Sequence, residues 1–319
     1  MRWYRIRARR TFEVAQTAGV CWGVDRAIRG IRGAARGKER SRVPQVLGWL
    51  IHDQNSIRQL EKDGIRTIES PEEATTEVIA ITAHGRDPKD IRRLQEQGFK
   101  VLDMTCPIVT NQHAEALKLK ESGRKIILVG TREPHPEVLG TRGVLDDEAI
   151  VVDSPFGAQL ITLHPETPIG VIAQTTHDPV VVDEVLWELK RRFRDVLYVP
   201  TACGDIALKL EEIREKAQKA DTIIVISEER SANGNNLARV ARAMQKTVIF
   251  ILDETKLERA MIAQARRIFI TAAASKFERD IDGVAAKLKS WGWRRRQPRG
   301  PVMTKEERAK MSARQAAGH

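Results

Sequence analysis

Three cysteines are the residues whose type and spacing most directly suggest chemistry. They stand at Cys21, Cys106 and Cys203, and Cys21 lies between Gly19 and Gly23, where the backbone can approach a bound group closely. An odd number of distant cysteines, with no Cys-x-x-Cys pair, argues against a disulfide framework or a zinc knuckle. Three thiolates from separate segments would suit an iron–sulfur cluster with one open iron, or a zinc ion with an open position. Small buried apolar side chains are the simpler interpretation.

A second group of reactive side chains follows the predicted strands. It consists of His52, His84, His135, Glu137, Thr175, Ser231, Asn233 and Ser275. The histidines, the hydroxyls and the loop at 231–236 would donate hydrogen bonds to a phosphate, whereas structural histidines and a helix cap are the alternatives. Glu137 would donate a proton if burial raises its pKa, and Thr175 would relay a proton or orient a hydroxyl. An exposed loop acid and an ordinary strand-end threonine are the alternatives for these two.

The elements that must position these side chains are short apolar runs that alternate with amphipathic stretches. We predict strands at 13–18, 46–51, 78–82, 101–104, 126–129, 149–152, 169–173, 196–200, 222–226, 248–252 and 268–271, and helices at 88–97, 109–121, 179–192, 206–217, 236–245 and 276–291. This alternation predicts an α/β fold with mostly parallel sheets covered on both faces. One large sheet is possible, but three small α/β domains, repeating about every 90 residues, fit the cysteine spacing better.

The domain boundaries follow from this repeat. We expect the first α/β domain at 13–106, the second at 107–200 and the third at 201–292, with a basic, disordered tail at 293–319. Ligands of open α/β sheets bind beyond the carboxyl ends of the strands. The candidate residues therefore lie where a shared site would form.

The composition narrows the class of protein. The chain has 319 residues, a formal net charge of +11 and a hydrophobic content of 41%. Much of the positive charge lies near the two ends, so an anionic small substrate or an acidic protein partner fits the body of the chain as well as nucleic acid does. No apolar run approaches the roughly 20 residues of a membrane span, and no signal peptide follows the basic N-terminus. We therefore expect a soluble cytoplasmic protein that binds no membrane.

Several motifs carry these residues, and their order along the chain is informative. They are Ala18-Gly-Val-Cys21-Trp-Gly-Val-Asp-Arg26-Ala, His52, Ala83-His84-Gly85, Asp103-Met-Thr-Cys106-Pro-Ile-Val-Thr110, His135-Pro-Glu137-Val-Leu-Gly-Thr141 and Gln174-Thr175-Thr176. Together they resemble the LytB/IspH family of 4-hydroxy-3-methylbut-2-enyl diphosphate reductases, over about residues 13 to 290.

The resemblance implies a fold, a cofactor and a set of residue roles. The family has three α/β domains around a central cavity that holds a [4Fe–4S] cluster, so Cys21, Cys106 and Cys203 resemble its ligands. The residues that resemble the diphosphate-binding positions are His52, His84, Ser231, Asn233 and Ser275, and His135 resembles a further substrate contact. Glu137 resembles the proton source, with Thr175 in its relay.

The implied reaction is a two-electron reductive dehydroxylation that gives isopentenyl and dimethylallyl diphosphate in the methylerythritol phosphate pathway of isoprenoid biosynthesis. Ferredoxin or flavodoxin would supply the electrons. The chain departs from the family pattern after Cys203, at Asp53, at Ala232 and after Ser275. Two other functions therefore stay open: a divergent paralogue that keeps the cluster but acts on another phosphorylated substrate, and a basic nucleic-acid-binding or regulatory protein on the same scaffold, although the charge distribution makes nucleic acid the weaker expectation.

Overall fold

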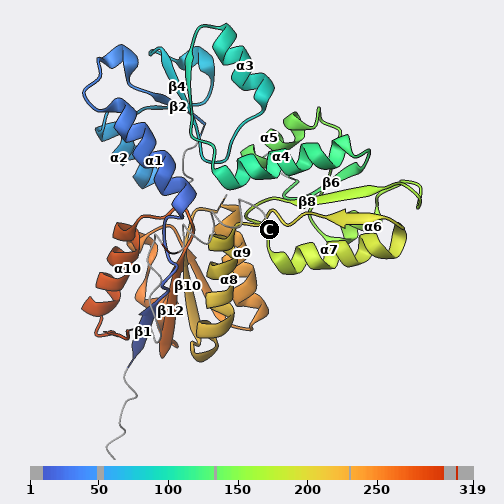
Figure 1. The fold of residues 1–319 in the computed structure, drawn as a ribbon. Coiled ribbons are helices and arrows are strands. Elements are labelled where there is room, and N and C mark those ends of the chain that lie inside the picture. Colours follow the sequence, from blue (N-terminus) through green and yellow to red (C-terminus); the bar gives the residue numbers. More distant parts are fainter. Residues whose placement is uncertain (1–9, 49–53, 133–134, 230, 298–306, 308–319) are drawn as a thin grey trace, which may run out of the picture. The chain divides into compact units, whose positions relative to one another are not determined.

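The computed structural model describes residues 10–48, 54–132, 135–229, 231–297 and 307 (Figure 1). The described residues divide into two compact units. Those within Met1–Cys21 and Leu208–Lys305 form the first unit, and those within Trp22–Ala207 and Glu306–His319 form the second. Among the described helices, none combines the length and the apolar character that a membrane span needs.

The first unit is built on a five-stranded parallel sheet with the order β11-β10-β12-β1-β13. Its strands are β1 (Thr11–Val14), β10 (Thr222–Ile226), β11 (Thr247–Ile251), β12 (Arg267–Ala272) and β13 (Arg294–Arg295), and its helices are α9 (Ala232–Ala243), α10 (Glu278–Ser290) and the 3-10 helices η3 (Ala217–Lys219), η4 (Glu254–Lys256) and η5 (Arg259–Ile262). Residues Ile223–Ile226 of β10 are fully buried, and α10 packs its apolar face on the sheet through Ile281, Val284 and Leu288. These β-branched runs form strands because both faces of the sheet are covered.

The second unit contains two four-stranded parallel sheets, with the orders β3-β2-β4-β5 and β7-β6-β8-β9. The strands are β2 (Gln45–Leu47), β3 (Thr67–Ile68), β4 (Val78–Ile81), β5 (Lys100–Asp103), β6 (Lys125–Val129), β7 (Ile150–Val152), β8 (Ile169–Ala173) and β9 (Val196–Tyr198). The helices are α1 (Trp22–Ala35), α2 (Gln54–Lys62), α3 (Pro88–Glu96), α4 (Pro107–Glu121), α5 (Pro136–Val144), α6 (Pro155–Gln159) and α7 (Pro179–Arg192), with 3-10 helices η1 (Arg40–Arg42) and η2 (Pro71–Glu73); α8 (Gly204–Lys216) spans the boundary between the units. The α/β class with three small parallel sheets is thus confirmed.

The three sheets share one strand order. In the two sheets of the second unit, the strands numbered along the chain have the order second, first, third, fourth: β3-β2-β4-β5 and β7-β6-β8-β9. The sheet of the first unit has the same order, β11-β10-β12-β1, if the N-terminal strand β1 is counted after β12 as the fourth strand. The first and third strands are neighbours, which is the switch point where α/β sheets bind ligands. The repeat expected from the cysteine spacing is therefore present in the topology.

The strand that fills the fourth place in the first unit corrects one predicted boundary. The predicted first domain, 13–106, begins with a strand at 13–18. The observed strand β1 covers Thr11–Val14 and pairs with β12 of the first unit, with Phe12 opposite Ile268. Phe12 is buried in the same core as Ile224 and Ile270. The strand joins this sheet because its apolar face completes that core. The other domain boundaries stay predictions.

The start of the predicted tail is also ordered. Trp293 is buried in the core of the first unit, and Arg294 and Arg295 form β13 beside β1. The guanidinium of Arg10 lies 5.5 Å from the centre of the Trp293 ring, a cation–π contact that further fixes this segment. Disorder was therefore the wrong expectation for 293–297, while 298–306 and 308–319 lie outside the described residues.

Candidate functional site

Each cysteine occupies the same place in its repeat. Cys21 follows β1, Cys106 follows β5 and Cys203 follows β9, which are the fourth strands of their sheets. Each also directly precedes a helix: α1 begins at Trp22, α4 at Pro107 and α8 at Gly204. The positive end of a helix macrodipole favours a thiolate. The position of each cysteine at a helix N-terminus thus favours its thiolate form, which is the form that binds a metal.

The second unit brings Cys106 and Cys203 together. Burial raises the pKa of Cys106, and the backbone amides of Ile108 and Val109 partly oppose this rise, although no capping hydrogen bond forms to the Cys106 side chain. Burial also raises the pKa of Cys203 to about 12 against the effect of the Ile206 amide, and the charges of Asp205 and Cys106 raise it further.

This environment suits a metal-bound thiolate better than a free one. The amide donors stabilise negative charge on sulfur, yet desolvation keeps the free thiols protonated. A bound metal removes the conflict because it deprotonates a coordinating thiol outright. The donor set is soft and lies close to backbone N–H groups, as at iron–sulfur clusters. The residues present therefore fit such a cluster.

A glycine of α1 lets that helix approach Cys106. A Cβ atom at Gly23 would lie 2.7 Å from Cys106 Sγ, and one at Gly30, two turns later, would lie 2.5 Å from Met104 Sδ. Arg26, between them, donates from Nη1 to the carbonyl oxygens of Met104 and Thr105 at 3.1 and 3.3 Å. The helix that follows Cys21 is thereby fastened to the loop that carries Cys106.

Glu137 is a buried carboxyl beside the thiols. It is 1% exposed, and Thr175 donates to it twice, from the backbone N–H at 2.5 Å and from Oγ1 at 3.0 Å. Burial raises the pKa of Glu137 to about 7, against the opposing effect of the two Thr175 hydrogen bonds. The Cys203 N–H donates to the Thr175 carbonyl at 2.8 Å, and the Glu137 charge acts on Cys106. Glu137 can therefore hold and release a proton near neutral pH.

Two half-buried histidines lie beside Glu137 in the same unit. The rings of His84 and His135 pack edge to face with centroids 5.6 Å apart. His135 caps α5, and its Nδ1 accepts the Glu137 N–H at 3.3 Å, so Nε2 carries the proton of the neutral ring. The Thr82 Oγ1 lies 3.4 Å from His84 Nδ1. Both rings thus have one nitrogen oriented by the protein.

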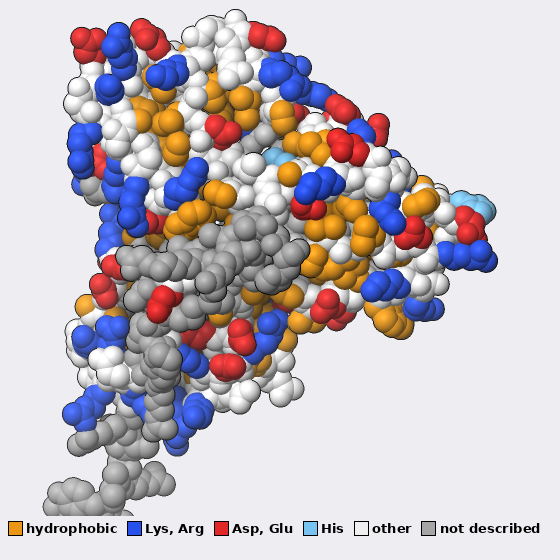
Figure 2. All heavy atoms as spheres, viewed as in Figure 1, with side chains coloured by type: hydrophobic (Ala, Val, Ile, Leu, Met, Phe, Trp, Pro, Cys, Tyr) orange, Lys and Arg blue, Asp and Glu red, His pale blue; other side chains and the backbone are white. Residues whose placement is uncertain are grey.

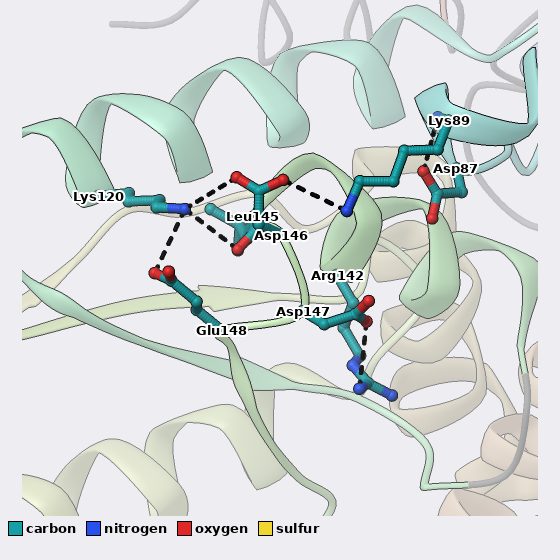
Figure 3. A network of polar contacts seen from close by, with 8 residues as sticks. All are labelled: Asp87, Lys89, Lys120, Arg142, Leu145, Asp146, Asp147 and Glu148. Carbon is teal, nitrogen blue, oxygen red and sulfur yellow. Dashed lines mark hydrogen bonds and ion pairs between the residues drawn. The ribbon is translucent and has the colours of Figure 1, made fainter. Parts of the chain in front are cut away.

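Polar contacts join the start of α3 to the turn that follows α5 (Figure 3). Asp87 caps α3 by accepting the Lys89 N–H at 2.8 Å, and its carboxyl occupies the space where a Gly143 side chain would lie. Lys89 and Lys120 pair with opposite oxygens of Asp146 at 3.3 and 3.2 Å. Since His84 lies three residues before Asp87 and His135 caps α5, this packing sets the spacing of the two rings.

The first unit gathers Cys21, Asn233 and Ser275 around one backbone segment. The Cys21 N–H donates to the Ala274 carbonyl at 3.2 Å, and the Ala274 N–H donates to Asn233 Oδ1 at 2.9 Å. The buried Asn233 Nδ2 and Ser275 Oγ have no hydrogen-bond partner among the described residues. Two unsatisfied buried donors beside a helix N-terminus are what an anion would satisfy. Ser231 differs, because its Oγ already caps α9 through the Gly234 N–H at 3.2 Å.

Two predictions about the site remain untested. His52 lies outside the described residues. Within either unit, the described residues contain no group of three or more His, Cys, Asp or Glu side chains that could hold a metal ion. The predicted three-thiol ligand set needs Cys21 from the first unit, so it stays a prediction.

Comparison with known proteins now places the chain. The family model described as LytB protein matches residues 12–289, which is most of the sequence. The chain belongs to the LytB family. Its relatives include the 4-hydroxy-3-methylbut-2-enyl diphosphate reductase of Burkholderia pseudomallei (strain 1026b), 30% identical over 88% of this chain and 89% of the relative, and that of Methylococcus capsulatus (strain ATCC 33009 / NCIMB 11132 / Bath), 31% identical over 88% and 91%.

Solved structures of LytB-family enzymes have the same fold. The E-1-hydroxy-2-methyl-but-2-enyl-4-diphosphate reductase from Plasmodium falciparum superposes with a TM-score of 0.84 at 19% identity, covering 96% of this chain and 99% of that one. An (E)-4-hydroxy-3-methyl-but-2-enyl diphosphate reductase described as the terminal enzyme of the non-mevalonate pathway gives 0.62 at 26% identity, covering 88% and 99%. The family resemblance stated from the motifs is confirmed.

Sequence reasoning missed the residues that support this LytB-family site. Buried Lys209 donates from Nζ to the carbonyl oxygens of Thr17 and of Gly19, the latter at 2.8 Å. Buried Glu212 accepts from the Thr17 N–H at 2.9 Å and from its Oγ1 at 2.7 Å. A lysine and a glutamate three residues apart on a helix are usually solvated, but here they are buried and together hold the loop that leads to Cys21. Lys209 belongs to the segment after Cys203 that departs from the family pattern.

Gln112 is a further supporting residue that was not predicted. It is fully buried in α4, and its Nε2 donates to the Ala173 carbonyl at 2.7 Å. Thr141 donates from Oγ1 to the Glu137 carbonyl at 2.8 Å and lies 3.4 Å from Gln112 Oε1. Gln112 thus joins the end of β8 to the helix that carries Glu137. A glutamine on the apolar side of a predicted helix was the available signal.

Proposed function

We propose that this chain is an iron–sulfur reductase that removes the hydroxyl of 4-hydroxy-3-methylbut-2-enyl diphosphate and yields isopentenyl and dimethylallyl diphosphate for isoprenoid biosynthesis. Its membership of the LytB family and the names of its relatives support the reaction class. The observation that carries the proposal is the buried Glu137 carboxyl, with its pKa near 7, held by Thr175 next to two thiols at helix N-termini.

Cys21, Cys106 and Cys203 would hold a [4Fe–4S] cluster, which supplies electrons and a Lewis-acidic iron for the substrate hydroxyl when it is bound. The buried thiols of Cys106 and Cys203, each at the N-terminus of a helix, support this assignment. Chain connectivity supports Cys21, because only Trp22 separates it from Gly23, where an added Cβ would lie 2.7 Å from Cys106 Sγ. Consecutive Cα atoms are about 3.8 Å apart, which keeps Cys21 within reach of a shared cluster.

The substrate diphosphate would be bound by six donors: His52, His84, His135, Ser231, Asn233 and Ser275. The unsatisfied Nδ2 of Asn233 and Oγ of Ser275 support this role, as does the protonated Nε2 of His135. The Ser231 Oγ uses a lone pair to accept the Gly234 N–H as a helix cap, so its hydroxyl proton would be the group left to donate to a phosphate oxygen.

Glu137 would deliver the proton that makes the substrate hydroxyl a good leaving group. The reaction replaces a C–OH bond by a C–H bond, so it consumes two electrons and two protons and releases one water. Glu137 supplies the proton to the departing oxygen, and Thr175 orients the carboxyl. An acid with a pKa near 7 is suited to this step because it is protonated before the step and able to release the proton at neutral pH.

Electrons would come from a ferredoxin or flavodoxin, and the location would be cytoplasmic. The net charge of +11 favours association with an acidic electron donor. On the face in Figure 2, the described Lys and Arg side chains are interspersed with Asp and Glu. This mixture is less favourable for a nucleic-acid phosphate backbone, which selects a continuous basic stripe.

The decisive experiment measures iron and acid-labile sulfide in freshly purified anaerobic protein, together with turnover of the hydroxylated diphosphate by a chemical reductant. A cluster with turnover is the expected result. A cluster without turnover would favour the divergent paralogue. Protein without iron or sulfide that binds nucleic acid in a salt-sensitive way, unchanged by Cys106→Ser, would favour the binding protein instead.

A further inference from the structure

A basic cleft lies in the first unit, at the amino ends of its strands. Its walls include Thr11 and Arg267, the first residues of β1 and β12, and Ala220, just before β10. The predicted substrate residues of this unit follow the carboxyl ends of β10 and β12. The cleft is therefore at the opposite end of the sheet and is separate from the proposed active site.

Positive charge dominates the cleft. Four cationic side chains and one carboxyl line it: Lys216, Lys219, Arg267, Arg296 and Glu13. Lys216 pairs with Glu212 at 3.2 Å, whereas the described residues provide no ion pair for the other three cations. The nearby Asp221 carboxylate accepts hydrogen bonds from the backbone N–H groups of Arg266 and Arg267 rather than from the cationic side chains of the cleft.

The acids near the cleft balance only part of this positive charge. Glu212 is bound by the loop before Cys21, and Glu13 is half-buried on the strand that faces α8. Burial raises the pKa of Glu13, which the surrounding cations partly oppose. Like charges gathered in one recess repel each other, and an anion with two or more negative charges relieves this repulsion.

We propose that this cleft is a binding site for a small polyanion of the diphosphate class. The cleft lies over the buried side chains of Phe12 and Phe269, and its enclosed volume is only about 30 Å³. It therefore has no room for a drug-sized ligand, and it suits a phosphate group that meets the cations at the cleft mouth while the rest of the polyanion stays in solvent. Arginine forks and lysine ammonium groups are the side chains that recognise such oxygens. The inference does not depend on the proposed function.

Titration calorimetry of the full-length anaerobic holoprotein with pyrophosphate tests the site. Asn233→Ala removes one of the six proposed diphosphate donors of the active site, so it weakens competing binding there and leaves the cleft unchanged. Adding Lys219→Ala and Arg267→Ala is expected to weaken the saturable binding that persists in this variant by at least about ten-fold, because two cations that would contact phosphate oxygens are lost.

The matched control replaces Lys256 and Arg266, two exposed cations of the same unit that do not line the cleft. This control removes the same charge and should change the affinity less than about two-fold. Glu13→Gln should strengthen binding, because it removes the one carboxyl that competes with the ligand. Equal losses in the cleft and control variants, or no saturable binding in the Asn233→Ala protein, would overturn the proposal. Cleft-dependent binding of an acidic protein without pyrophosphate binding would also overturn it.

Discussion

Thr175 donates two hydrogen bonds to the buried carboxyl of Glu137, one from its backbone N–H and one from its hydroxyl. Both bonds favour the carboxylate, while burial favours the acid, and the balance leaves the pKa of Glu137 at about 7. The same Thr175 accepts the Cys203 N–H through its carbonyl. One residue thus connects the proposed acid to a proposed cluster ligand.

The first prediction concerns pH. If protonated Glu137 is the acid, kcat should fall as pH rises through about 7, because the carboxyl loses its proton there. Glu137→Gln should lower kcat by about 10²- to 10⁴-fold and abolish that part of the profile. Steady-state kinetics with dithionite as reductant would check both results, with iron content as the control for an intact cluster.

The same carboxyl makes stability depend on pH. Its folded pKa of about 7 lies above the ordinary value of 4.5 for a glutamate, so the folded state holds the proton more tightly than the unfolded chain. This contribution to the free energy of unfolding is fully present below about pH 4.5 and is lost as pH rises through about 7. Urea unfolding should show this loss in the parent chain and not in Glu137→Gln, and an identical pH dependence in both would contradict the assignment.

The second prediction separates the two Thr175 hydrogen bonds. Thr175→Val keeps the N–H donor but removes the hydroxyl, which lowers the pKa of Glu137 in the parent chain. The pKa should therefore rise further, and the decline of kcat should move to higher pH. Thr176→Val is the matched control, since the Thr176 hydroxyl accepts from Gln174 at 3.1 Å and is not bonded to Glu137. A profile shifted toward lower pH would show that the hydroxyl has another role.

The third prediction tests the approach of α1 to Cys106. Gly23→Ala places a methyl group 2.7 Å from Cys106 Sγ, too close for an ordinary contact, so the thiol or the helix must move. We expect a clear loss of iron and sulfide per chain. Gly33→Ala, on the same helix, meets nothing within 4 Å and should stabilise the helix by up to about 1 kcal/mol with full cluster content. Equal iron content in both variants would mean that Gly23 is not needed for the cluster.

Much of the fold could be predicted from the sequence, because the buried strands are almost continuous apolar runs. Residues Ile169–Ala173 and Thr222–Ile226 are buried throughout, and the predicted strands there match the observed ones. The partner of β1 could not be predicted, because it pairs with a strand more than 250 residues later. Short edge strands such as Thr67–Ile68 have too few residues to show a pattern.

Part of the site could also be predicted from the sequence, because the positions of the strands could be predicted. Residues placed after strands, such as Glu137, Thr175 and Cys203, do come together, because parallel strands present their carboxyl ends on one edge. The burial of Glu137 could not be deduced from its loop position. The close approach of Gly23 to Cys106 could not be deduced either, because it depends on how a helix lies across a distant loop.

The last prediction concerns the contact that spaces His84 and His135. A methyl group at Gly143 would overlap the Asp87 carboxyl, so Gly143→Ala should lower the free energy of unfolding by about 1–3 kcal/mol, the usual cost of overpacking. Asp87→Ala removes the obstructing carboxyl together with a helix cap worth about 1 kcal/mol. The double variant should lose less stability than the sum of the two single losses, because the methyl group then has room. Urea unfolding of the four proteins measures this coupling, and strict additivity would show that α3 and α5 do not meet at these two residues.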